Sequence, residues 1–239
     1  MLKVMGQPAI CSRSWKSQKG VRLESGARAF KLHLLRERVG YAVKMSEKRL
    51  TVVLIGPPAS GKSTLAPLLA QQLGLEQVQL DEIRWAYYDE IGFDHAHAAE
   101  LSRAGDLLAM YHYCKPFEIH ALERVLIEHA GAVIELGGGH SVHEDPALLE
   151  RARLALLAIP YVVLLMPSSD MSQSLEVLRA RTLQKAPKEG WEPSEEVLEL
   201  FDHLARHPSN ALLAKQRTYT LGRTPLESVQ EILKLVRPQ

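Results

Sequence analysis

Short, almost wholly apolar runs alternate along the chain with longer segments that have a helical spacing of leucines. The clearest apolar runs are residues 50–55, 132–136 and 161–166, each rich in aliphatic or β-branched side chains. Continuous rather than alternating hydrophobicity is typical of strands that are covered on both faces, as in a parallel sheet. The pattern therefore predicts an α/β fold in which strands and helices alternate through right-handed crossovers.

Helix signals lie between and after these runs. Leucines three to four positions apart predict a helix over residues 63–73, and Gly74 should end it. Asp145, followed by a proline, is a typical N-cap, so we expect another helix over 147–157. Residues 224–227, Thr-Pro-Leu-Glu, form a capping box that should open the last helix.

A polar stretch over residues 168–210 interrupts this alternation. It contains helical segments but no apolar run that would predict a strand. We interpret it as an insertion or helical lid over the functional site.

Composition narrows the class of protein. The 239 residues are 46% hydrophobic and 24% charged, which is usual for a globular protein. The two cysteines, Cys11 and Cys114, provide no disulfide framework, and this fits a reducing compartment such as the cytoplasm. The longest apolar runs have about six residues, far fewer than a membrane span needs. We therefore expect neither a disulfide-rich secreted protein nor a membrane protein.

Charge is distributed unevenly along the chain. Residues 1–49 contain 12 Lys or Arg and 3 acidic residues, whereas the rest contains 17 basic and 25 acidic residues. An acidic body argues against broad nucleic-acid binding, because that requires a basic face. Residues 1–48 show no periodic pattern, and we expect a disordered basic extension before a domain over 49–239.

Three interpretations of the basic extension stay open. Residues 1–44 could precede a working start at Met45, which comes just before the first apolar run. They could instead be a transit peptide, which would direct the protein to an organelle. They could also be an arm that contacts RNA or a membrane.

A phosphate-binding motif follows the first apolar run. Residues 56–63 match G-x-x-x-x-G-K-[ST] at every fixed position, between a predicted strand and a predicted helix. In such a loop, backbone N–H groups and the helix N-terminus bind phosphates, Lys62 bridges the β- and γ-phosphates, and Ser63 binds Mg²⁺. The motif predicts a site for ATP and Mg²⁺ that consists of Gly56, Pro57, Pro58, Ala59, Ser60, Gly61, Lys62, Ser63 and Thr64.

Two further features bear on the phosphate acceptor. A predicted strand over 76–80 is followed by Asp81, which could accept a proton from a substrate hydroxyl or simply cap the next helix. The strand over 132–136 is followed by Gly137, Gly138 and Gly139, which would let a ligand approach the backbone closely or form a flexible turn.

Together, the motif at 56–63, Leu80-Asp81 and the sequence Val-Ile-Glu-Leu-Gly-Gly-Gly at 133–139 resemble shikimate kinase and its small-molecule kinase relatives. The resemblance extends over about residues 50–236. It implies a P-loop NTPase three-layer sandwich with a five-stranded parallel sheet of order 2-3-1-4-5 and a mobile lid. It also implies phosphate transfer from Mg-ATP to a hydroxyl of a small metabolite. Asp81 would contact that hydroxyl, and the three glycines would line the acceptor pocket.

The chain departs from the family pattern at several positions. Gln79 stands where the family has an Asp that assists Mg²⁺, and Glu135 could take that role. Lys115 is the nearest match to the Arg of an Arg-x-x-Glu pattern that binds the shikimate carboxylate, although a Lys cannot form the bidentate fork. The lid arginine has no direct counterpart, and Arg181 and Arg179 are the candidates for stabilising the transferred charge.

Histidine-rich segments allow more than one interpretation. Residues 89–115 contain several His and Tyr side chains that could shape an acceptor pocket or lie on ordinary helix surfaces. His140, His143 and Glu144 follow the three glycines and could form a metal site, contact the acceptor or belong to a plain loop.

The functional hypotheses from sequence follow from these features. The first is a kinase, monomeric or homodimeric, for a small hydroxylated metabolite. The alternatives are an ATP-binding regulatory protein with little turnover and a kinase of a nucleoside or a nucleic-acid end.

Overall fold

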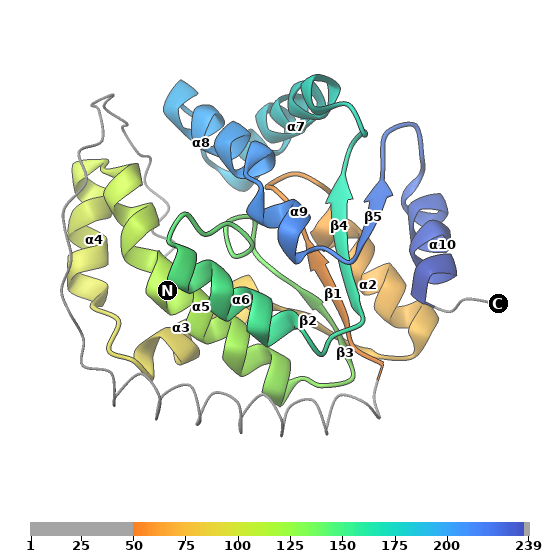
Figure 1. Ribbon diagram of the computed structural model, residues 1–239. Helices are drawn as coiled ribbons and strands as arrows, with labels where there is room; N and C mark the ends of the chain where they lie inside the picture. Colours follow the sequence, from red (N-terminus) through yellow and green to blue (C-terminus); the bar gives the residue numbers. More distant parts are fainter. Residues whose placement is uncertain (1–49, 237–239) are drawn as a thin grey trace.

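Five parallel strands form the centre of the molecule (Figure 1). The structure, a computed structural model, describes residues 50–236. The sheet has the order β2-β3-β1-β4-β5, as the family resemblance implies. Val53 of the central strand pairs in register with Ile134 on one side and Val162 on the other. The strands are β1 (Val52–Ile55), β2 (Glu76–Gln79), β3 (Ala132–Glu135), β4 (Tyr161–Met166) and β5 (Gln216–Tyr219).

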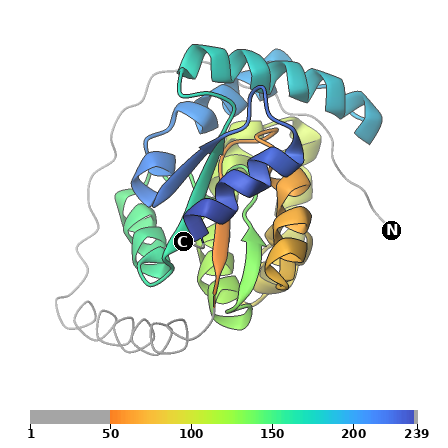
Figure 2. The same ribbon diagram turned by 90° about the vertical axis from the view of Figure 1, so that its right-hand side faces the viewer.

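Helices connect the strands and cover both faces of the sheet. They are α2 (Lys62–Leu73), α3 (Leu80–Asp89), α4 (His95–Ala104), α5 (Leu107–Glu128), α6 (Pro146–Leu156), α7 (Met171–Lys185), α8 (Glu195–Arg206), α9 (Ser209–Leu213) and α10 (Pro225–Val236), with a 3₁₀ turn η1 (Ala186–Glu189). Figure 2 shows the resulting three layers.

The alternation of side chains along β1 explains the two cores. Val52 and Leu54 point to one face and pack with α2 and α10. Val53 and Ile55 point to the opposite face and pack with α3, α5 and α6. Since both faces are covered, β1 is fully buried, which is why its sequence is continuously apolar.

The predicted strands are confirmed, but their bounds differ in part: β1 begins at Val52 rather than at residue 50, and β3 ends at Glu135 rather than at residue 136. β4 covers the predicted residues, but β2 ends at Gln79 and Leu80 already begins α3. The prediction of a strand over 76–80 is therefore one residue too long. Gln79 forms the last pair with β3, and Asp81 lies in the first turn of α3, where the helix dipole favours acidic side chains.

The predicted helix ends are confirmed by the backbone. Gly74 ends α2 in the left-handed region with φ 65°. Asp145 accepts hydrogen bonds from the N–H groups of the first turn of α6. At the start of α10, Glu227 N–H donates to Thr224 Oγ1 at 3.3 Å and Thr224 N–H donates to Glu227 Oε2 at 2.7 Å.

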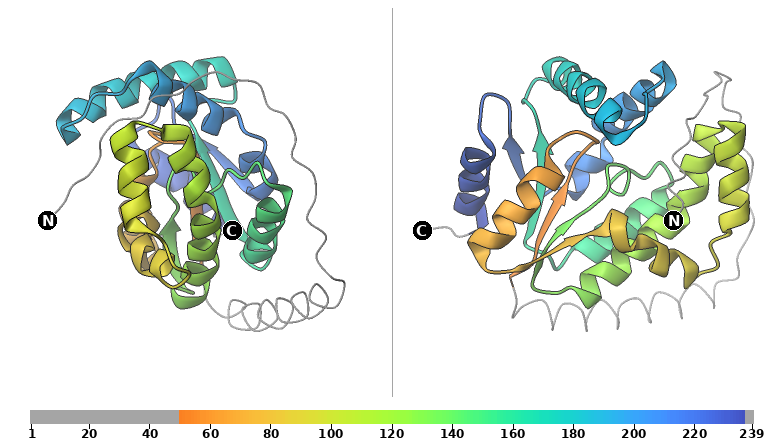
Figure 3. Two further views of the ribbon diagram at one scale, coloured as in Figure 1. Left: turned by 90° about the vertical axis from the view of Figure 1, so that its left-hand side faces the viewer. Right: turned by 180° about the vertical axis from the view of Figure 1, so that it is seen from behind.

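Residues 168–210 are helical as expected, and the described structure places no strand among them. Helices α7 and α8 lie across the carboxyl ends of the strands (Figures 1 and 3). Arg179 of α7 connects the two helices through ion pairs with Asp202 at 2.9 Å and Glu195 at 2.8 Å.

The expectations for residues 1–48, including the transit peptide and the start at Met45, lie outside the described residues. Across residues 50–236, none of the helices has the length and apolar character that a membrane span requires.

Candidate active site

The loop between β1 and α2 has the conformation that its glycines predict. Gly56 has φ 140°, and a Cβ there would lie 2.5 Å from the Leu165 carbonyl oxygen. Gly61 has φ 103° and precedes α2 without any side-chain cap. The N-terminus of α2 therefore offers backbone N–H groups and its positive dipole end to an anion.

The side chain of Lys62, the first residue of α2, folds back onto this loop. Its ammonium donates to the carbonyl oxygens of Gly56 at 2.8 Å and Pro57 at 3.0 Å. Burial lowers the pKa of the Lys62 ammonium to about 8, although the nearby carboxylates of Glu135 and Asp81 favour its charged form. The charge is thus placed beside the phosphate-binding backbone.

A cavity of about 380 Å³ opens over the loop. That volume is in the range of small-molecule and cofactor sites. Cations from three parts of the chain line it, together with the acidic side chain of Glu135: Lys62 from α2, Arg181, Lys185 and Lys188 from α7 and η1, and Arg223 from the segment after β5. Such a lining fits a polyanionic ligand.

The two candidate arginines of α7 have different surroundings. Arg181 lines the cavity, and its Nη1 donates to the Ala59 carbonyl oxygen at 3.3 Å. Arg179 is engaged with two acidic side chains that connect α7 to α8, so the expectation that it stabilises transferred charge is not supported. The two arginine side chains point in different directions because residues two positions apart lie on different faces of a helix.

Asp81 lies beside the end of β3, as expected of an acceptor-binding residue. Its side chain is 43% exposed and accepts a hydrogen bond from Arg84 Nη1 at 2.8 Å. His140 Nδ1 lies 3.9 Å from its Oδ1. A Cβ at Gly137 would come within 2.5 Å of the same oxygen.

The three glycines face three different neighbours. Gly137 adjoins Asp81, and a Cβ at Gly138 would lie 2.6 Å from the ring of Pro58. Gly139 is less crowded, since its nearest neighbour would be Lys115 Nζ at 3.5 Å. The glycines thus bring β3 close to both Asp81 and the phosphate-binding loop.

Lys115 lies next to these glycines, but its charge is already paired. Its ammonium donates to Glu118 Oε2 at 2.7 Å and to the Gly139 carbonyl oxygen at 2.9 Å, and it lies over the ring of Tyr111. Burial alone would raise the pKa of the Glu118 carboxyl, but the Lys115 ammonium lowers it. Lys115 and Glu118 therefore form a buried ion pair.

Glu135, at the end of β3, is paired in register with Gln79. Burial raises the pKa of the Glu135 carboxyl to about 7, while Lys62 favours its charged form. Its Oε2 is buried and has no hydrogen-bond partner among residues 50–236. A buried unpaired oxygen beside a phosphate loop is a candidate ligand for a cation or a water.

Some residues of the histidine-rich segments lie on the surface, and others lie near the candidate site. His95 pairs with Asp89 at 2.6 Å and His97 packs on Tyr113, so both belong to the surface of the helical region. Tyr111 instead reaches the loop after β3, where its hydroxyl donates to Glu144 Oε1 at 2.8 Å.

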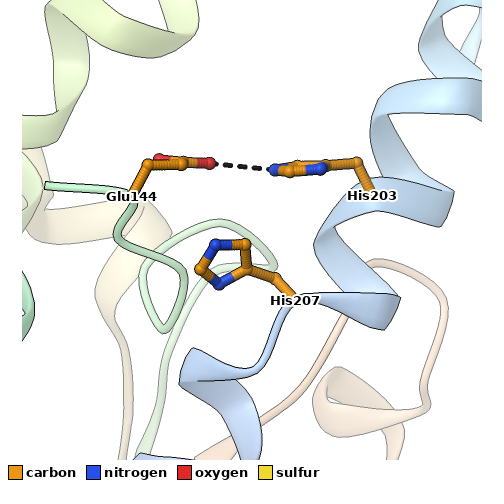
Figure 4. A group of neighbouring side chains, drawn as sticks. All are labelled: Glu144, His203 and His207. Atoms are coloured by element: carbon orange, nitrogen blue, oxygen red, sulfur yellow. Dashed lines mark hydrogen bonds and ion pairs between the residues drawn. The ribbon is translucent and has the colours of Figure 1, made fainter.

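His140 and His143 are each only 2% exposed, so they lie in the interior of the loop after the three glycines. Burial lowers the pKa of both, to about 4 for His143. Glu144 accepts from His203 at 2.9 Å and lies beside His207 (Figure 4). A metal site formed by His140 and His143 with Glu144 is therefore not observed within the described residues, because Glu144 points toward α8 instead.

The chain is 32% identical over 193 residues to the shikimate kinase of Streptomyces coelicolor. The alignment covers 77% of this chain and 94% of that protein. The chain belongs to the shikimate kinase family. It is thus a small-molecule kinase that acts on a hydroxyl group.

Solved structures support the fold assignment. The shikimate kinase from Acinetobacter baumannii in complex with shikimate superposes with a TM-score of 0.55 at 20% identity, covering 81% of this chain and 96% of that one. A gluconokinase from Sinorhizobium meliloti matches at 15% identity with a TM-score of 0.47, over 79% of this chain and 93% of that one, which is too weak to bear on the acceptor. No protein-family model matches the chain.

Sequence reasoning missed several residues of the site. Arg84 could have been found from its position three residues after Asp81 on the same helix. Lys188 and Arg223 reach the cavity from separate segments, and nothing local in the sequence distinguishes them from surface cations.

Proposed function

We propose that the protein transfers the γ-phosphate of ATP to a hydroxyl of a small hydroxylated metabolite, with shikimate as the first acceptor to test. The observation that carries this proposal is a cation-lined cavity that opens onto the phosphate loop, while the Asp81 carboxylate lies beside the end of the neighbouring strand. Family membership supports the reaction type.

The nucleotide would occupy the cavity over α2. Backbone N–H groups at the helix N-terminus would bind the β-phosphate, and Lys62 would leave its carbonyl partners to contact the β- and γ-phosphates. Arg181 approaches the same loop from α7 and would stabilise charge on the transferred group. We propose that residues 168–210 act as a lid, since α7 supplies these cations.

The residues present fit a magnesium ion, which prefers oxygen ligands. Ser63 lines the cavity, and the buried Glu135 Oε2 lacks a partner in the described structure. We therefore assign Ser63 and Glu135 to hold Mg²⁺. When bound, the ion neutralises charge on the phosphate oxygens of ATP.

Asp81 would act on the acceptor. The acceptor oxygen attacks the γ-phosphorus, the bond between that phosphorus and the β–γ bridging oxygen breaks, and ADP leaves. The Asp81 carboxylate orients the hydroxyl and takes its proton. Arg84, paired with one Asp81 oxygen at 2.8 Å, orients the carboxylate.

Lys115 informs the choice of acceptor. Because Glu118 already neutralises its charge, Lys115 offers an acceptor carboxylate less attraction than a free cation would. Tests with shikimate should therefore be accompanied by gluconate and nucleosides.

The experiment is ADP release by the full chain with Mg-ATP, alone and with each acceptor. Acceptor-stimulated ADP release is expected, and Lys62→Ala should lower it by roughly 10²-fold or more. Asp81→Asn should lower kcat by roughly 10²–10⁴-fold while ATP binding is retained. Asp89→Asn, at the other end of α3, serves as the matched control and should leave kcat unchanged.

Other outcomes would contradict the proposal. Full turnover by the Lys62 variant would exclude the phosphate loop as the donor site. Bound ATP with no turnover on any acceptor would favour a regulatory ATP-binding protein. Salt-sensitive binding of a nucleic acid that depends on residues 1–44 would favour a macromolecular acceptor.

A further inference from the structure

Three potential metal ligands meet at the end of α8, outside the nucleotide cavity. His203 lies in the last turn of α8, His207 is its C-cap residue, and Glu144 comes from the loop between β3 and α6. Figure 4 shows the side chains of Glu144, His203 and His207 converging. None of them lines the nucleotide cavity.

The spacing of these side chains suits a single ion. One ligand atom from each residue lies within 4.8 Å of the other two. Zinc binds His nitrogen and carboxylate oxygen at about 2.0–2.2 Å, so ligand atoms on one ion lie about 3–4 Å apart. Small side-chain rotations would bring the three atoms to that separation. Within residues 50–236, no other group of three or more His, Cys, Asp or Glu side chains gathers as closely.

The helix and its neighbours position the ligands. His203 and His207 are four residues apart and therefore share one face at the end of α8. Glu144 Oε1 already accepts from His203 Nε2 at 2.9 Å and from the Tyr111 hydroxyl at 2.8 Å. A carboxylate oriented by a second hydrogen bond is typical of metal sites, where outer partners set the direction of each ligand.

We propose that Glu144, His203 and His207 form a binding site for Zn²⁺. Two imidazoles and one carboxylate are zinc ligands, whereas magnesium and calcium prefer oxygen ligands alone. The side chain of His203 is 48% exposed, so an ion can enter from solvent and retain a water as its fourth ligand. His207 Nδ1 accepts a long hydrogen bond of 3.3 Å from Ser209 N–H, and this weak bond would be lost on binding through Nε2, because the ring proton would then lie on Nδ1.

A zinc ion here would connect two segments that are distant in the sequence. It would join α8 to the loop that begins with the three glycines at the end of β3. Without metal, the His203–Glu144 hydrogen bond provides the connection between these residues. Zinc would therefore reduce local opening of α8, independently of nucleotide binding.

The test is a Zn²⁺ titration of the tag-free full chain by equilibrium dialysis with metal analysis. We expect one bound ion, and an affinity lowered about tenfold or more in Glu144→Gln, His203→Asn and His207→Asn. His120→Asn is the matched control, since His120 pairs with Glu90 at 2.8 Å but belongs to no group of three potential ligands within residues 50–236. The His120→Asn variant should bind zinc with the same affinity as the unmodified chain.

Two further readouts keep the result independent of kinase activity. Co²⁺ should give visible absorption bands in the unmodified chain that are absent from His207→Asn. Zinc should slow amide hydrogen exchange over residues 195–213 in the unmodified chain but not in His203→Asn. Nucleotide binding by each variant shows that it has folded, because these residues lie outside the nucleotide cavity.

The proposal is overturned if zinc does not bind in a saturable manner, or if the three variants bind it as the unmodified chain does. If zinc binds but does not slow amide hydrogen exchange over residues 195–213, the inference that the ion connects α8 to the loop after β3 is overturned.

Discussion

The glycines after β3 have different surroundings, although the sequence shows three identical residues. Gly138 adjoins the ring of Pro58 in the phosphate loop, where a methyl group would overlap atoms at 2.6 Å. Gly139 has ordinary van der Waals space, with its nearest neighbour at 3.5 Å. The same substitution should therefore have unequal effects at the two positions.

Gly138→Ala should weaken nucleotide binding and lower the free energy of unfolding by about 1–3 kcal/mol, the usual effect of overpacking. Gly139→Ala, its matched control, should change the free energy of unfolding by less than about 1 kcal/mol. Urea denaturation and titration with a non-hydrolysable ATP analogue measure both quantities. Equal losses in the two variants would contradict this interpretation.

The partly buried position of Cys114 should make its thiol slow to react with alkylating reagents. Burial raises its pKa to about 11, and Met110 Sδ lies 3.8 Å from its Sγ. Because only the thiolate attacks alkylating reagents, a raised pKa reduces the reactive fraction below pH 11.

In a Cys11→Ser variant, alkylation of Cys114 by iodoacetamide should be slow at pH 8. Its rate should rise roughly tenfold for each pH unit from 8 to 10, as the thiolate fraction does. Peptide mass spectrometry at several pH values measures this rate, with an unfolded sample in urea as the reference. A rate that levels off near pH 9 would show that the thiol has its ordinary pKa.

At the scale of an element, α10 depends on a local signal. Its capping box satisfies N–H groups that the helix cannot satisfy itself, and its apolar residues Val229, Ile232 and Val236 pack on the sheet. Helix formation and packing are thus supported by separate interactions, and the cap can be removed without changing the buried face.

Thr224→Ala should lower the free energy of unfolding by about 0.5–2 kcal/mol through loss of the cap. Ser172→Ala, at an exposed position in the first turn of α7, is the control and should change it by less than about 0.5 kcal/mol. Chemical denaturation of the three proteins provides the comparison. A negligible effect at Thr224 would mean that water replaces the cap.

For the whole molecule, sheet order determines which distant segments meet. Since β1 lies between β3 and β4, the phosphate loop is placed between the three glycines and α7. Sites in open α/β sheets form at such a point, outside the carboxyl ends of the strands. The candidate site therefore draws on segments from Gly56 to Arg223.

The two largest buried clusters among the described residues lie one on each face of the sheet, and their members fall within residues 50–236. A chain that starts at Met45 should therefore fold with a similar melting temperature and retain phosphotransfer to a small acceptor. Differential scanning calorimetry and ADP release compare it with the full chain. A large loss of either property would assign a structural or functional role to residues 1–44.

The sequence by itself determined the phosphate loop, the central strands and the capped helix ends. These features depend on contiguous residues, because backbone conformation and burial on both faces leave a local pattern. The family resemblance then provided the strand order, which the structure confirms. The structure also places Asp81 beside Gly137.

Only the tertiary structure decided how the charged side chains are paired. Lys115 forms a buried pair with Glu118, Arg179 connects α7 to α8, and Glu144 lies beside two histidines about 60 residues away. Charge energies depend on distance and burial, and neither is encoded in the spacing along the chain. For that reason the cavity lining and the proposed zinc site could not be predicted before the segments were brought together.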